Sequence, residues 1–277
     1  MIVLAARLHF AAMILWQPFG PGAWVRETQM AHHGALSAVR VTAVRLDPTA
    51  VRFALDSATR DYGTRGAWTV DRLPRDGLLA VNTGQFIGGV PWGWVVHNGS
   101  ETSAPGRGSL AMSFVVDSAG VASLLLPTET AVARGHVRLA LQSYPALLID
   151  GELPWELRAS QRGANLEHRD TRLAIGTLAD GSVVVAITRF GAMGSVAETL
   201  PFGPTVVEMA GFMRSLGCRR AMLLDGGISS QMALRDKDGS IRQWTNWRKV
   251  PLGLVVTSRS NDAAGNPQTT RSMLRSR

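Results

Sequence analysis

The sequence predicts an α+β domain in which mixed or antiparallel multi-stranded sheets pack with a few helices. Segments with the alternating apolar and polar pattern of half-buried strands follow one another along the chain, and most are separated by turn residues. Helical periodicity is clear at one place, residues 203–218. Strands and helices do not alternate regularly over the whole length, which argues against a doubly wound parallel sheet.

The first part of the chain predicts strands with one short helix. Residues 37–55, SAVRVTAVRLDPTAVRFAL, alternate on both sides of an LDPT turn and predict a hairpin. Residues 66–74, GAWTVDRLP, predict a short helix. The stretch GLLAVNTGQF predicts a buried strand over residues 78–81 that ends at Asn82. A turn around Pro91 then leads to a strand with a turn at Asn98 and Gly99.

The second part predicts two further hairpins and the helix. The hairpins cover residues 109–126, turning at DSAG, and 172–189, turning at ADGS, while residues 137–153 predict strand, break, strand and turn. Strands are also expected over residues 220–225 and 250–258. Pro204 suits the first turn of the helix and Gly217 its end. The apolar face of the helix consists of Val206, Met209, Ala210, Met213 and Leu216.

Composition limits the class of protein. The 277 residues suffice for one large domain or two small ones with a sizeable core. Cys218 is the only cysteine, which excludes an intrachain disulfide and a multi-cysteine zinc site. We expect it to pack beside a helix end as a small apolar residue.

The net charge of +8 makes nucleic-acid binding a class to consider. The basic residues are scattered, however, and no Lys/Arg-rich run of six or more occurs. Several arginines fall within the last twenty residues. A solvated basic surface therefore explains the charge, and we predict no nucleic-acid partner.

The N-terminal segment, MIVLAARLHFAAMILW, is apolar but is interrupted by Arg7 and His9. Its uncharged run over residues 10–16 is too short to cross a bilayer, and we predict no stable membrane span. We expect residues 1–30 to be signal-like or disordered, residues 31–257 to form the domain, and residues 258–277 to be a disordered basic tail. The signal-like reading favours an extracytoplasmic location over a cytoplasmic one, with a start further downstream as the alternative.

At four places an apolar strand delivers a polar side chain next to glycines: Asn82, Gln142, Arg172 and Asp225. Glycines permit positive φ and let a ligand approach backbone N–H groups. Each side chain also has a purely structural alternative. These are an Asx turn for Asn82, a buried backbone partner for Gln142, an ion pair for Arg172 and a turn cap for Asp225.

Taken together and in order, the blocks around these residues resemble the phosphodiester glycosidase family. The blocks are NTGQF, LQSYPALLIDGEL, RLAIG, LGCRRAMLLDGGISSQM and WRKVPLGLVV, and the resemblance runs from about residue 41 to about residue 256. The aspartate block is the most specific. Two positions depart from the pattern: Tyr144 stands where glycine is usual, and Ile228 replaces the third glycine after the aspartate.

The resemblance implies a hydrolase that cleaves the glycosidic bond of a sugar-1-phosphodiester or a related glycoconjugate. Asp225 would be the nucleophile or general base, Arg172 would clamp the phosphate, and Asn82 and Gln142 would orient sugar hydroxyls or water. The second carboxylate is open between Asp170 and Glu208. The expected substrate-binding residues are Gly84, Gly226, Gly227, Ser229, Ser230 and Trp92.

Other readings stay open at this point. We predict no cofactor and no protein-bound catalytic metal, and leave a divalent ion held by carboxylates open, since the six histidines show no ligand spacing. The expected partner is a carbohydrate or sugar phosphate, with an exopolysaccharide or the cell envelope as its source, and the oligomeric state is not fixed. A non-catalytic carbohydrate or cell-envelope binding protein on the same scaffold is the alternative function, motivated by Tyr144 and Ile228.

Overall fold

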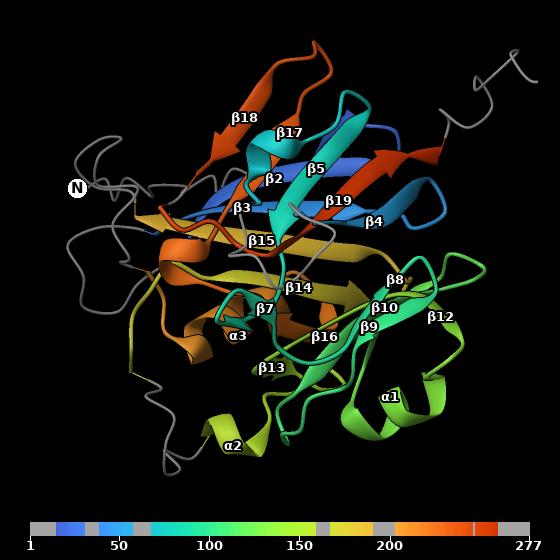
Figure 1. The fold of residues 1–277 in the computed structure, drawn as a ribbon. Coiled ribbons are helices and arrows are strands. Elements are labelled where there is room, and N and C mark those ends of the chain that lie inside the picture. Colours follow the sequence, from blue (N-terminus) through green and yellow to red (C-terminus); the bar gives the residue numbers. More distant parts are fainter. Residues whose placement is uncertain are drawn as a thin grey trace, which may run out of the picture.

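The computed structural model describes residues 15–30, 39–57, 68–158, 167–190, 203–245 and 247–259 (Figure 1). Its largest sheet has seven strands, and all neighbouring strands in it pair antiparallel. In spatial order they are β1 (Gln17–Gly20), β2 (Ala23–Met30), β3 (Val39–Leu46), β15 (Val183–Phe190), β14 (Leu173–Leu178), β16 (Cys218–Leu223) and β13 (Ala146–Leu148).

Two five-stranded antiparallel sheets pack with it. One has the order β18 (Ile241–Trp244), β17 (Met232–Arg235), β5 (Gly77–Asn82), β19 (Leu252–Ser258) and β4 (Val51–Ser57). The other has the order β11 (Ala122–Leu125), β10 (Met112–Asp117), β12 (Val137–Ser143), β8 (Val95–His97) and β9 (Ser100–Ser103). A short hairpin consists of β6 (Phe86–Ile87) and β7 (Val90–Pro91).

The described helices are few and short: α1 (Pro127–Ala133), α2 (Trp155–Arg158) and α3 (Val206–Ser215), with 3-10 turns η1 (Val70–Arg72) and η3 (Gly227–Ser229). The predicted α+β class therefore holds in part, because the described residues are richer in strand than a balanced α+β fold. The predicted antiparallel pairing and the small number of helices are both observed.

The main core lies on one face of the seven-stranded sheet. Val44 and Ile187 of that sheet pack in one cluster with Leu79 of β5 and Leu254 of β19. The third sheet joins this core, and the rings of Phe53 and Phe114 meet edge to face at 5.4 Å. In Figure 1 the sheet of β5, β17 and β19 lies above the seven-stranded sheet, and α3 lies below it.

Helix α3 covers the opposite face of the seven-stranded sheet, where Met209 and Met213 pack in a second cluster with Ala43. The predicted helix is confirmed, and its N-cap is Thr205, so Pro204 precedes the helix rather than lying in its first turn. A capping box fixes this start. Thr205 Oγ1 accepts from the Glu208 backbone N–H at 3.2 Å, and Glu208 Oε2 accepts from that of Thr205 at 2.9 Å.

The predicted hairpin over residues 37–55 is wrong in its pairing. Both strands exist, but β3 pairs with β2 and β15, while β4 pairs with β19 in another sheet. Alternation predicts that a strand is half-buried and does not specify its partner. The Asp47 carboxylate, which accepts from the Thr49 backbone N–H at 2.8 Å, stabilises the turn at which the chain changes sheets.

The predicted signal-like or disordered segment is also corrected, because residues 17–30 form β1 and β2 of the largest sheet. Phe19, Ala23 and Val25 are buried in the main core, and this burial fixes the segment in the domain. Residue 258 ends β19 and so belongs to the sheet rather than to a tail. Residues 1–14 and 260–277, on which the rest of those expectations fall, lie outside the described residues.

Of the helix predicted over residues 66–74 the structure shows the 3-10 turn η1 at Val70–Arg72, and residues 66 and 67 lie outside the described residues. The predicted hairpins and the predicted burial of Cys218 agree with the structure. The hairpins β8–β9, β10–β11 and β14–β15 form where expected, and Asn98 and Gly99 adopt φ of 51° and 80° in the first of them. Cys218 is buried beside α3, and burial raises the pKa of its thiol to about 12. The thiol is therefore a core group rather than a nucleophile.

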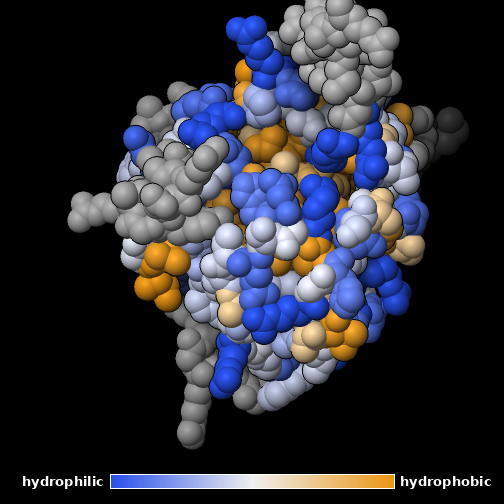
Figure 2. All heavy atoms as spheres, turned by 45° about the vertical axis from the view of Figure 1, so that its right-hand side comes forward, coloured by the Kyte–Doolittle hydropathy of each residue, from blue (hydrophilic) through white to orange (hydrophobic). Residues whose placement is uncertain are grey.

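None of the helices that the structure describes is long and apolar enough to cross a membrane. Figure 2 shows one face of the molecule, on which hydrophilic side chains dominate and hydrophobic side chains form separate small groups. On this face the surface resembles that of an ordinary globular domain.

Candidate active site

The loop after β16, residues 225–231, is held by the side chain of Asn82. Asn82 Nδ2 donates to the Asp225 carbonyl at 2.8 Å, and Asn82 Oδ1 accepts from the Gln231 backbone N–H at 2.8 Å. The Asp225 backbone N–H in turn donates to the Thr83 carbonyl at 2.9 Å. The end of β5 thus fixes both ends of the loop. Asn82 and Asp225, which were predicted to lie together, are in direct contact.

The Asp225 carboxyl lies half-buried at the start of this loop. Burial raises its pKa above the usual range, and the charge of Asp170 adds to the rise. A hydrogen bond from Ser229 and the charge of Arg248 act in the opposite direction. Asp225 therefore has the environment of a group that holds its proton more readily than a surface aspartate does.

Gly226 and Gly227 let residues 170 and 171 approach the loop. Gly227 has φ of 57°, and a Cβ there would lie 2.6 Å from Asp170 Oδ2. A Cβ on Gly226 would lie 2.8 Å from the Thr171 carbonyl oxygen, which accepts from the Gly227 N–H at 2.8 Å. The two glycines are needed for this contact, because any side chain would force the segments apart.

Asp170 is the second carboxylate near Asp225. Burial raises the pKa of the Asp170 carboxyl, while the Thr171 N–H at 2.8 Å and the charges of Arg172 and His168 oppose the rise. His168 Nε2 lies 3.6 Å from Asp170 Oδ2. From sequence alone Asp170 and Glu208 were equal candidates, and the structure brings only Asp170 against the aspartate loop.

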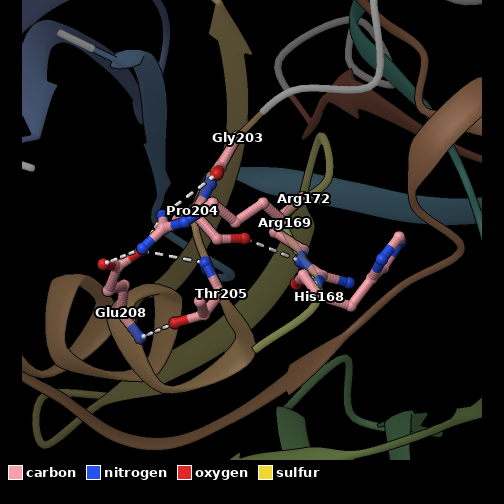
Figure 3. Close-up of polar contacts among 7 residues, drawn as sticks. All are labelled: His168, Arg169, Arg172, Gly203, Pro204, Thr205 and Glu208. Atoms are coloured by element: carbon pink, nitrogen blue, oxygen red, sulfur yellow. Dashed lines mark hydrogen bonds and ion pairs between the residues drawn. The ribbon is translucent and has the colours of Figure 1, made fainter. Parts of the chain in front are cut away.

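Glu208 has a structural role instead (Figure 3). Besides capping α3, its two carboxylate oxygens accept from Arg169 at 2.8 and 2.9 Å. The pair joins the N-terminus of α3 to the segment that leads into β14. A carboxylate with three such contacts fixes the position of that segment.

The Arg172 guanidinium also contacts backbone groups, as Figure 3 shows. Its Nε donates to the Pro204 carbonyl at 3.1 Å and its Nη2 to the His168 carbonyl at 2.6 Å. Burial lowers the pKa of this guanidinium, and the Asp170 carboxylate opposes the shift. The side chain stays charged at neutral pH, so it adds positive potential beside Asp170 while holding two segments together.

Gln142 lies on β12, in a different sheet from β16, which leads into the Asp225 loop. Its Oε1 accepts from the Gly106 N–H at 2.6 Å and the Trp94 N–H at 3.0 Å. Gly84, two residues beyond Asn82, passes so close to β12 that a Cβ would overlap the Gln142 carbonyl oxygen. Gln142 therefore borders the site through Gly84, with its side-chain amide bound to backbone.

Trp92 and Tyr144 lie beyond Gly84. Their rings meet edge to face at 5.0 Å between centroids, and Tyr144 is exposed. Gln85, which was not singled out from the sequence, joins the two segments: its Nε2 donates to the Tyr144 carbonyl at 2.6 Å, and its Oε1 accepts from the Ser143 hydroxyl at 2.8 Å. The signal was present, because Gln85 belongs to the NTGQF block.

Ser229 and Ser230 are both buried in the loop, and the Ser230 carbonyl accepts from Arg189 Nη2 at 2.9 Å. No hydrogen-bond partner for the Ser230 and Thr171 hydroxyls is present among the residues that the structure describes. These two hydroxyls are therefore hydrogen-bond donors within or next to the Asp225 loop. Arg189, a buried arginine on β15, was not singled out from the sequence.

Within the described ranges, no group of three or more His, Cys, Asp or Glu side chains forms a metal site. The site as described is made of two carboxylates with raised pKa values, Asp170 and Asp225, hydroxyl and backbone donors, and nearby arginines. Such a set is suited to acid–base chemistry on a substrate that carries negative charge.

The family model for phosphodiester glycosidases matches residues 76–257, well over half of the chain. The chain belongs to the phosphodiester glycosidase family. The resemblance drawn from the motif blocks is thus confirmed, and the matched range contains each of the predicted site residues. The comparison with curated proteins found no match.

Solved structures share the fold at low identity. The catalytic domain of zebrafish N-acetylglucosamine-1-phosphodiester alpha-N-acetylglucosaminidase, auto-inhibited by its pro-peptide, is 17% identical with a TM-score of 0.67, over 86% of this chain and 83% of that one. A hypothetical protein from Synechocystis is 15% identical with a TM-score of 0.59, over 88% of this chain and 64% of that one. At these identities the likeness establishes the fold.

Proposed function

We propose that this protein is a hydrolase that cleaves the glycosidic bond of a sugar-1-phosphodiester, with Asp225 as its central carboxylate. Family membership supports the reaction class. The observation that carries the proposal is the position of Asp225: it lies in a loop held at both ends by Asn82, with Asp170 close enough to raise its pKa.

The reaction asks little of a general acid. The bond from the anomeric carbon to oxygen breaks, its electron pair stays on the oxygen, and a phosphate monoester leaves. Water supplies hydroxide to the anomeric carbon and a proton to a base, so the products are a free sugar and the monoester. Because phosphate is a good leaving group, the enzyme mainly stabilises the oxocarbenium-like transition state and the departing charge.

Two neighbouring carboxyls with raised pKa values suit this reaction. Like charges in one site disfavour ionisation of both, so the ionised form of one carboxyl makes the other hold its proton more readily. We assign to Asp225 the attack on the anomeric carbon, either directly or through a water molecule. We assign to Asp170 the proton that the two neighbouring carboxyls share. Asp225 has this role because its half-buried carboxyl stands at the start of the glycine loop, where Ser229 and the charge of Arg248 act on it.

The substrate phosphate would be stabilised by the positive charges of Arg172 and Arg248 and by donors of the loop. Arg248 already acts electrostatically on Asp225, and Ser229 donates to the same carboxyl. Asn82 and Gln142 serve as positioning residues, because backbone groups occupy their side-chain amides. An exopolysaccharide or the cell envelope remains our expected source of substrate.

A panel of sugar-1-phosphodiesters and nucleotide sugars, hydrolysed in ¹⁸O-labelled water, tests the proposal. Attack at the anomeric carbon places the label in the free sugar, whereas attack at phosphorus places it in the phosphate. We expect the label in the sugar. Label in the phosphate would make the protein a phosphodiesterase. Saturable binding without any product would instead support the non-catalytic carbohydrate-binding reading.

A further inference from the structure

Phe86 ends the NTGQF block, and the proposed function leaves it without a role. Its half-buried side chain stands at the start of β6. The ring packs against the core cluster that contains Trp68 and Val250. The Arg248 guanidinium lies over this ring, with its central carbon 5.6 Å from the ring centroid. The core therefore holds the ring, and the ring in turn supports a guanidinium.

The backbone of Arg248 is bound to the loop that begins at Asp225. Its N–H donates to the Ile228 carbonyl at 3.0 Å, and its carbonyl accepts from Gln231 Nε2 at 2.8 Å. Both partners belong to the loop whose two ends the Asn82 side chain holds. The main chain at Arg248 is therefore fixed relative to Asp225.

The side chain of Arg248 is exposed, so its backbone contacts alone do not fix the position of its charge. A long arginine side chain has many rotamers, which place the guanidinium several ångströms apart. An aromatic face within about 6 Å attracts a guanidinium and favours the rotamers that stack on it. The ring of Phe86 therefore selects among the positions that the Arg248 charge can take.

The position of this charge matters to the Asp225 carboxyl. Burial is the largest effect and raises the pKa of Asp225. The hydrogen bond from Ser229 and the charge of Arg248 lower it, and the charge of Asp170 raises it further. Because a Coulomb interaction weakens with distance and with exposure to salt water, a guanidinium turned into the solvent would stabilise the Asp225 carboxylate less.

We propose that Phe86 is a positioning residue of the active site, whose ring holds the Arg248 guanidinium beside the Asp225 carboxylate. The contact favours the ionised form of Asp225, which the attack on the anomeric carbon requires. The proposal rests on the proposed function, because that function is what requires Asp225 to be ionised. The contact also joins the NTGQF block to the WRKVPLGLVV block.

Replacing Phe86 tests the contact without touching a charged group. Phe86→Leu keeps an apolar side chain against Trp68 and Val250 but removes the aromatic face. Phe86→Tyr keeps the ring and is the conservative variant. Phe212→Leu is the matched control, because it makes the same change at another half-buried phenylalanine, on α3. Thermal unfolding checks that each variant folds, and Phe86→Met takes the place of Phe86→Leu if the latter does not.

A pH titration of the Asp225 carboxyl by carbon-13 NMR measures the effect without turnover, with Asp225→Asn identifying the signal. We expect the titration midpoint to move to higher pH by about half a pH unit in Phe86→Leu, and by at least as much in Arg248→Gln. Phe86→Tyr and Phe212→Leu should titrate as the wild type does. Adding Phe86→Leu to Arg248→Gln should cause no further change, because both act through the same charge.

Three results of this titration would overturn the proposal. The first is a midpoint in Phe86→Leu equal to that of the wild type. The second is an equal change in Phe86→Tyr, since the aromatic face would then not be the cause. The third is a change from Phe86→Leu that persists in full when Arg248 is already replaced, since the ring would then act without the guanidinium.

Turnover distinguishes this proposal from the proposed function. On a sugar-1-phosphodiester that the wild type hydrolyses, the acid limb of kcat/KM should move in Phe86→Leu in the same direction as the NMR midpoint. An acid limb that stays in place while the midpoint moves would contradict the role of Asp225 and leave the contact supported. If the wild type hydrolyses no such substrate, the proposed function fails, and the titration still decides whether Phe86 positions Arg248.

Discussion

Asn82 Nδ2 donates to the carbonyl of Asp225 at 2.8 Å, although 143 residues separate the two in the chain. The other end of the same amide accepts from the Gln231 N–H. One side chain thus closes the loop that carries the central carboxylate. This contact makes Asn82 a positioning residue whose loss should affect both folding and chemistry.

Replacing Asn82 should be costly. Asn82→Ala leaves the Asp225 carbonyl and the Gln231 N–H, both inside the fold, without their partner, and we expect unfolding to become easier by about 2–4 kcal/mol. Asn82→Asp keeps the acceptor for Gln231 but loses the donor to Asp225. Urea unfolding measures the free energy of unfolding of both variants. A decrease of less than about 0.5 kcal/mol for Asn82→Ala would contradict the role of Asn82 in holding the loop.

The two candidates for the second carboxylate, Asp170 and Glu208, should differ in how much their replacement lowers turnover. Glu208→Gln keeps an oxygen for the Thr205 N–H but loses the charge that pairs with Arg169 and one of the two hydrogen bonds from that side chain, so turnover should stay within a few-fold of the wild type. Asp170→Asn keeps the shape of the side chain but can neither give up nor take up a proton, and we expect kcat to fall by about 10²-fold. A larger loss of turnover in Glu208→Gln than in Asp170→Asn would indicate that Glu208 is the second carboxylate.

The raised pKa of Asp170 predicts a direction for stability against pH. The folded protein binds the proton more tightly than the unfolded chain does, so this carboxyl destabilises the fold progressively as pH rises from about 4. Asp170→Asn should therefore be more stable than the wild type at pH 7, and the difference should shrink at pH 3. Thermal unfolding of the variant and the wild type at the two pH values measures this difference in stability. A variant less stable than the wild type at pH 7 would contradict the raised pKa of Asp170.

Gly227 should tolerate no side chain. Gly227→Ala places a Cβ 2.6 Å from Asp170 Oδ2 at a φ of 57°, so it combines backbone strain with a clash. Gly88→Ala is the matched control, because its φ is 61° and no atom lies within 4 Å of the added Cβ. We expect about 1 kcal/mol of destabilisation for the control and at least twice that for Gly227→Ala. Equal losses would mean that the contact with Asp170 does not constrain the loop.

The sequence predicted those parts of the site that lie on single strand ends. Asp225 follows a buried strand and precedes two glycines, and the order of blocks that accompanies it led to the family. It could not distinguish Asp170 from Glu208, because the choice depends on which segment packs against Gly227. Arg189 was not singled out for a related reason: its burial at the end of the strand VVVAITRF depends on contacts with segments far away in the chain, such as Ser230.

The fold shows the same difference between features set by neighbouring residues and features set by residues far away in the chain. Strands and turns set by neighbouring residues, such as the Asn98-Gly99 hairpin and the capped helix α3, were predicted. Pairing between distant strands was not. β3 and β4 are close in sequence yet join different sheets, and the strands β15 and β19 that pair with them there come from residues more than a hundred positions away.

The turnover of Asp225→Asn tests the central claim most directly. The variant keeps the size of the side chain and its capacity to accept from Ser229, and Asp76→Asn, at an exposed aspartate, is the control. On a sugar-1-phosphodiester that the wild type hydrolyses, we predict a loss of about 10³-fold or more in kcat. We expect the melting temperature of the variant to be at least as high as that of the wild type. Turnover by Asp225→Asn close to the wild-type rate would contradict the account.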